Sequence, residues 1–122
     1  MSAERRFSGL IRVPFVRRCE LDLQGAPAST AFLVNINVLG AYVARDDQPI
    51  LGNRLTCRFH VPDSEQEVVV GGVVAWLNPK QQHLVHSLPP GFGIKFEALS
   101  PEARTRIERI VQEHVARHPE SR

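Results

Sequence analysis

The chain has 122 residues, of which 43% are hydrophobic and 23% charged, and its formal net charge is +2. These values are close to those of ordinary globular domains, so they argue against a disordered or fibrous chain and against a general polyanion-coating protein. The length fits one domain with a single hydrophobic core.

The charge is unevenly distributed along the chain. Residues 46–67 carry five acidic side chains, whereas five arginines fall within the first eighteen residues: Arg5, Arg6, Arg12, Arg17 and Arg18. We therefore expect residues 1–13 to form a basic N-terminal arm that attracts anions.

Alternation of apolar and polar residues predicts a series of short strands. The clearest is residues 14–23, which end with Cys19, Leu21 and Leu23 on one face. Further strands are expected at residues 30–38, 41–44, 55–61, 67–70, 73–77 and 91–96, with a long loop over 78–90. The pair Gly71-Gly72 interrupts the pattern, and such glycines commonly mark a bulge where a sheet curls into a barrel.

The C-terminal segment changes to a helical period. Ser100 is a good N-cap, Pro101 suits the first helical position, and Pro119 ends the pattern. A helix is expected over 100–118, followed by a tail at 119–122. Short strands closed by one amphipathic helix indicate a small antiparallel barrel that the helix plugs or flanks.

Four segments resemble the PilZ domain family in the order in which they occur. They are Arg12-Val13-Pro14 at a strand entry, residues 35–40 (NINVLG), residues 74–76 (VAW) and residues 91–96 (GFGIKF). The resemblance implies an all-β domain over 14–118, a six-stranded antiparallel barrel with one C-terminal helix. It also implies no catalytic activity and, in binding members, a cyclic di-GMP site made by an R-x-x-x-R arm and a [D/N]-x-S-x-x-G turn.

In the second motif, Asn35 and Gly40 match the first and last positions, while Asn37 stands where the family usually has serine. Asparagine keeps both a hydrogen-bond donor and an acceptor but is larger than serine. We expect weakened or retuned binding at this turn.

In the arm motif, Arg12 matches the second arginine, but Ser8 occupies the place of the first. Arg5 or Arg6 is a candidate substitute if the chain loops at Gly9. Guanidinium groups bind phosphates bidentately, pair with guanine edges and stack on bases, which suits a doubly charged dinucleotide. The candidate ligand-binding residues are therefore Arg5, Arg6, Arg12, Asn35, Asn37 and Gly40.

Simpler explanations exist for each of these residues. The arginines are also consistent with a solvated tail, Asn35 and Gly40 with ordinary turn residues, and Trp76 with the core rather than a binding platform. The histidine pairs at 83/86 and 114/118 lack further ligands at a suitable spacing, so no metal site is predicted. No catalytic motif is evident, and an enzyme is not expected.

Two functions remain in competition. The first is a small signalling protein that binds cyclic di-GMP and acts on a separate partner protein. The second is an adaptor that does not bind nucleotide and regulates motility or polarity through protein contacts; Ser8 and Asn37 favour it. Nucleic-acid binding ranks below both, because the chain has only one Tyr and one Trp for base stacking.

The sequence also indicates the compartment. Cys19 and Cys57 are far apart and form no disulfide or zinc motif, which favours a reducing cytoplasm. No apolar run is long enough for a signal peptide or for membrane insertion.

Overall fold

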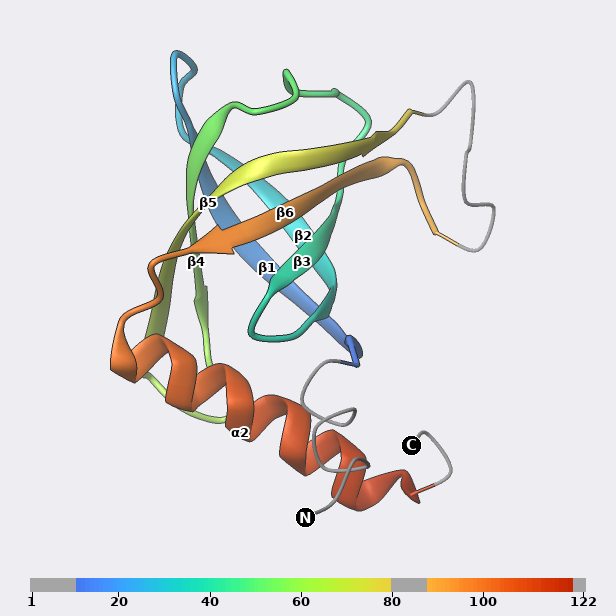
Figure 1. The fold of residues 1–122 in the computed structure, drawn as a ribbon, viewed down its shortest axis with the longest axis vertical. Helices are drawn as coiled ribbons and strands as arrows, with labels where there is room; N and C mark the ends of the chain where they lie inside the picture. The colour runs from blue at the N-terminus through green and yellow to red at the C-terminus, as the bar shows by residue number, and fades with distance from the viewer. Residues whose placement is uncertain (1–10, 80–87, 120–122) are drawn as a thin grey trace.

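Six antiparallel strands close into a barrel in the order β1-β2-β3-β6-β5-β4, with one helix after the last strand (Figure 1). The computed structural model describes residues 11–79 and 88–119. The predicted six-stranded antiparallel barrel with a C-terminal helix is confirmed. The elements are β1 (Val13–Leu23), β2 (Ser29–Ile36), β3 (Gly40–Ala44), β4 (Arg54–His60), β5 (Glu67–Asn78), β6 (Gly91–Glu97) and α2 (Pro101–Arg117).

The core fills the barrel interior because alternate residues of each strand point inward. Cys19, Leu21 and Leu23 are all buried, as their alternation predicts. Both cysteines are unbridged and buried. Phe15 of β1 meets Phe59 of β4 edge to face, with ring centroids 5.4 Å apart.

The two glycines at 71 and 72 do not interrupt β5, which runs unbroken from residue 67 to residue 78. The prediction of two separate strands is therefore wrong. Gly72 pairs with Phe96 of β6, and a Cβ on Gly72 would collide with the Lys95 carbonyl oxygen. The glycine thus permits a close approach of β5 and β6 within a continuous ladder. The irregular register lies further along, between Val74 and Trp76.

Helix α2 closes one end of the barrel. The Ser100 hydroxyl accepts a hydrogen bond from the Ala103 N–H at 3.0 Å, which confirms the predicted N-cap. Buried side chains of α2 join the barrel core, and Arg106 donates to the Glu67 carbonyl oxygen at 2.8 Å. Figure 1 shows the β2–β3 turn and the start of β1 at the same end as α2. Within the described residues, no helix has the length and apolar character needed to cross a membrane.

Candidate functional site

The turn between β2 and β3 is held by the Asn37 side chain. Its Oδ1 accepts hydrogen bonds from the N–H of Leu39 at 2.8 Å and of Gly40 at 3.1 Å. The Asn37 N–H in turn donates to the Gly40 carbonyl oxygen at 2.9 Å, and Asn37 is only 2% exposed. Asn37, which stands at the serine position of the motif, therefore stabilises the turn through its side-chain amide oxygen. It also ends β2 at Ile36, two residues before the predicted end.

Asn35, by contrast, does not hold the turn. It lies in the ladder between Pro14 of β1 and Tyr42 of β3. Its Oδ1 is buried and has no hydrogen-bond partner among the residues that the structure describes. A buried acceptor without a partner costs about 1–3 kcal/mol, so a donor supplied by a ligand would recover that free energy.

Arg12 lies beside Gly40, just before β1 begins. Its Nη2 is 3.1 Å from the position that a Cβ on Gly40 would occupy, and the same Cβ would collide with the Ile94 carbonyl oxygen. Glycine at position 40 therefore lets the turn pack against both the guanidinium and β6. Desolvation lowers the pKa of Arg12 below its ordinary value, although the residue as a whole is exposed. A guanidinium still carries its charge at neutral pH.

A pocket of about 440 Å³ begins at Arg12 and the β2–β3 turn and extends to the start of α2. We call it the cationic pocket, because Arg12, Lys95 and Arg104 line it and none of its described lining residues is acidic. Lys95 pairs with Gly40 across β3 and β6. The seven other lining residues are Val38, Leu39, Ala75, Ile94, Phe96, Ala98 and Leu99.

The sequence did not predict Lys95 and Arg104 as site residues. Lys95 follows the alternation of the 91–96 strand and is expected to face outward, and Arg104 lies on the polar side of the predicted helix. The strand alternation and the helical period each predict an exposed side chain, but neither predicts that Lys95 and Arg104 lie close to each other. Only the closure of the barrel, with α2 at its end, brings these side chains to the pocket that Arg12 lines.

Trp76 lies outside the barrel core, so its interpretation as a core residue is wrong. It is half-buried, and its indole lies against Gly93, where a Cβ would collide with the ring. The ring centroids of Trp76 and Tyr42 are 5.3 Å apart. The neighbouring residue Ala75 lines the cationic pocket. Trp76 and Tyr42 themselves are not among the lining residues of the pocket.

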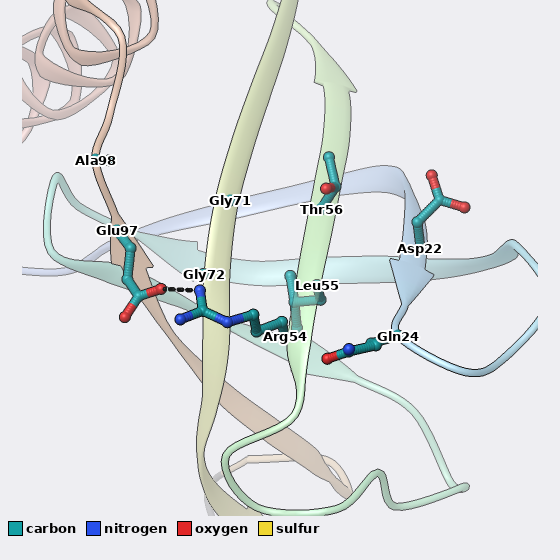
Figure 2. A pocket seen from close by; sticks show the side chains of 9 residues that line it. All are labelled: Asp22, Gln24, Arg54, Leu55, Thr56, Gly71, Gly72, Glu97 and Ala98. Carbon is teal, nitrogen blue, oxygen red and sulfur yellow. Dashed lines mark hydrogen bonds and ion pairs between the residues drawn. The ribbon is translucent and has the colours of Figure 1, made fainter.

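A second pocket of about 480 Å³ lies over β1, β4, β5 and β6 (Figure 2). Asp22, Thr56, Gly71 and Glu97 follow one another across these strands. Arg54 reaches over the neighbouring strand to Glu97, with Nη1 and Oε1 3.0 Å apart. The lining of this second pocket holds two carboxylates, Asp22 and Glu97, and one arginine, and it includes none of the predicted site residues.

The structure brings four of the six predicted site residues, Arg12, Asn35, Asn37 and Gly40, to the end of the barrel where β1 begins and β2 ends. Arg5 and Arg6 lie outside the described residues, as does the histidine pair at 83/86. The rings of His114 and His118 stack with centroids 4.5 Å apart. In residues 11–79 and 88–119, no group of three or more His, Cys, Asp or Glu side chains could hold a metal ion.

Comparisons with known proteins agree with this fold. The family model described as "PilZ domain" matches residues 3–113. No curated protein matches the chain. Among solved structures, the Bacillus subtilis inhibitor of motility MotI/DgrA has a TM-score of 0.67 at 12% identity, covering 88% of this chain and 50% of that chain. This chain thus spans about half of MotI/DgrA. The PilZ domain of CeSA from a cellulose-synthesizing bacterium has a TM-score of 0.58 at 13% identity, covering 85% and 97%.

Proposed function

Since the chain belongs to the PilZ domain family, we propose that it is a signalling protein that binds cyclic di-GMP in the cationic pocket and acts on a separate partner protein. The observation that carries the proposal is the set of three cations, Arg12, Lys95 and Arg104, around one pocket without an acidic lining residue. None of the three has an ion pair or a side-chain hydrogen bond within the described part of the chain. Like charges held together without counter-charges favour an anionic ligand.

The residues of the turn and the arm have distinct proposed roles. Arg12 contacts a phosphate or a guanine edge, for which a guanidinium is well suited. The Asn35 Oδ1 accepts a hydrogen bond from a guanine N–H, which supplies its missing donor. Asn37 acts indirectly, by holding the turn, and Gly40 keeps the turn close to Arg12. The pocket volume of about 440 Å³ lies within the usual range of ligand sites.

We propose that the basic arm completes the site. Arg5 or Arg6 takes the role of the arginine that Ser8 replaces, and closure of the arm over the ligand changes the surface that the partner protein contacts. The buried thiols of Cys19 and Cys57 fit a protein of the reducing cytoplasm. No catalytic step is proposed.

Calorimetric titration with cyclic di-GMP tests this function. We expect wild-type protein to bind with micromolar or tighter affinity, and the Arg12→Ala/Asn35→Ala variant to lose binding while remaining folded. Arg109→Ala is the matched control, because Arg109 is an exposed arginine of α2 that does not line the pocket. Binding that is unchanged in the double variant would overturn the proposed site.

The alternative function is an adaptor that binds no nucleotide. Two observations favour it: Ser8 replaces the first arginine of the arm, and the Asn37 Oδ1 accepts hydrogen bonds from the Leu39 and Gly40 N–H groups of the turn itself. A wild-type protein that is folded but gives no heat with cyclic di-GMP supports the adaptor. The search then moves to protein partners.

A further inference from the structure

Two of the cations in the cationic pocket come from elements that the nucleotide motifs do not include. Lys95 is the fifth residue of β6 and lies directly opposite Gly40 of the β2–β3 turn. The end of β6 is also fixed to this turn, because the Phe96 N–H donates to the Leu39 carbonyl oxygen at 2.9 Å. Lys95 thus has a fixed backbone position next to the turn.

Arg104 lies near the start of α2 and also lines the pocket. Its N–H donates to the Ser100 carbonyl oxygen at 2.9 Å, within a helix start that the Ser100 side chain caps. Three residues, 98–100, separate β6 from α2, and Ala98 and Leu99 line the pocket. The connection between barrel and helix therefore forms one wall of the pocket.

Neither of these two charges takes part in an ion pair within the described part of the chain. Glu97 lines the second pocket, where its Oε1 is 3.0 Å from Arg54 Nη1. Arg106, two residues beyond Arg104, differs from it because its side chain donates a hydrogen bond to the Glu67 carbonyl oxygen. Among the described residues, neither Lys95 nor Arg104 forms an ion pair, and both line a pocket of about 440 Å³ that is large enough for a phosphate group.

We infer that Lys95 and Arg104 form a second anion subsite in the cationic pocket, separate from Arg12, and that a ligand with two phosphates bridges the barrel to α2. This inference rests on the proposed function, because it takes cyclic di-GMP as the two-phosphate ligand. One phosphate lies near Arg12 and the turn, and the other lies between Lys95 and Arg104. Ligand binding then stabilises the docking of α2 on the barrel.

Calorimetric titration of charge-neutral variants with cyclic di-GMP tests the subsite. Loss of one charge-assisted contact weakens binding by roughly tenfold or more, so we expect that effect for Lys95→Gln and for Arg104→Gln. The double variant should be weaker than either single variant. Arg109→Gln removes the same charge from α2 outside the pocket and should bind as wild type does.

Hydrogen exchange of α2 provides a second measurement on the same proteins. We expect cyclic di-GMP to slow exchange of the amides in residues 103–111 of the wild type, and to slow it much less in Lys95→Gln/Arg104→Gln at equal occupancy.

The possible outcomes separate the two proposals. Wild-type affinity in the Lys95→Gln/Arg104→Gln variant, with binding still lost in Arg12→Ala/Asn35→Ala, would overturn the subsite and leave the proposed function standing. An absence of binding by folded wild-type protein would overturn both.

Discussion

The Asn37 Oδ1 accepts a hydrogen bond from the Gly40 N–H at 3.1 Å, and the Gly40 carbonyl oxygen accepts one from the Asn37 N–H at 2.9 Å. The two residues thus close the β2–β3 turn reciprocally. Because Gly40 also lies against Arg12, the geometry of this turn sets the position of one wall of the cationic pocket.

Replacing Asn37 should destabilise the protein. Asn37→Ala removes a buried acceptor and leaves two backbone N–H groups without that partner, so we expect a loss of about 1–3 kcal/mol in the free energy of unfolding. Asn37→Ser should lose less, because a serine hydroxyl makes similar but weaker turn hydrogen bonds. Urea denaturation measures both, and an alanine variant as stable as the wild type would contradict this role of Asn37.

Adjacent glycines of β5 should respond in opposite ways to the same substitution. A Cβ on Gly72 would meet the Ile94 Cγ2 at 2.9 Å and collide with the Lys95 carbonyl oxygen, so Gly72→Ala should cost about 1–3 kcal/mol. A Cβ on Gly71 would have only the Leu55 carbonyl oxygen near it, at 3.9 Å. Gly71→Ala should therefore be neutral or stabilise by up to about 1 kcal/mol. If Gly72→Ala and Gly71→Ala changed the melting temperature equally, β6 would not approach β5 closely at Gly72.

Tyr42→Phe tests a buried polar contact on the outer side of β3. The fully buried Tyr42 hydroxyl donates to the Pro89 carbonyl oxygen and accepts from Asn78 Nδ2 at 3.1 Å. Loss of the hydroxyl should lower the free energy of unfolding by about 1–3 kcal/mol, measured at pH 7. Phe92→Leu is a useful comparison, because it changes an equally buried ring without any polar contact. A Tyr42→Phe variant that unfolds like the wild type would contradict the contact.

The same residue predicts a dependence on alkaline pH. Desolvation raises the pKa of Tyr42, so the folded protein keeps a proton that the unfolded chain loses above pH of about 10. The contribution of protonated Tyr42 to the free energy of unfolding is fully present below that pH, and it is lost as the pH rises through the pKa of Tyr42 in the folded protein. Tyr42 is the only tyrosine, so Tyr42→Phe should flatten this part of the stability curve. Interaction with the Cys19 thiol and burial also raise the pKa of Cys57. The loss of stability that this thiol causes begins at a lower pH than that of Tyr42, because an unfolded cysteine titrates below an unfolded tyrosine, and it should remain in the Tyr42→Phe variant.

Trp76 offers an intrinsic signal for ligand binding. It is the only tryptophan, it is half-buried, and its neighbour Ala75 lines the cationic pocket. We expect cyclic di-GMP to change its fluorescence, with a midpoint equal to the calorimetric dissociation constant, because a base close to an indole alters its surroundings. Trp76→Phe should remove the signal. A calorimetric titration with no fluorescence change would place the ligand away from Trp76.

The fold was largely predictable because alternation reports which side of a strand faces the core, as Cys19, Leu21 and Leu23 illustrate. The error at Gly71 and Gly72 has a specific origin, since a glycine that ends a strand and one that admits a close neighbour look alike in sequence. Arg12, Asn35 and Gly40 were predicted as candidate site residues from the resemblance to the PilZ family motifs. The common location of Lys95 and Arg104 at one pocket could not be predicted, because it depends on packing between distant segments, which local patterns do not report.

Closure of the barrel restricts how a partner protein can recognise this domain. In the described structure each of the six strands pairs with a neighbour on both sides. A strand of a partner could therefore pair only where a strand extends past its ladder, as β1 does before Glu20 on the side that faces β4. Elsewhere, recognition depends on side chains on the outer faces of the strands or along α2. Any specificity for the partner then depends on exposed residues, which can change during evolution without disturbing the core.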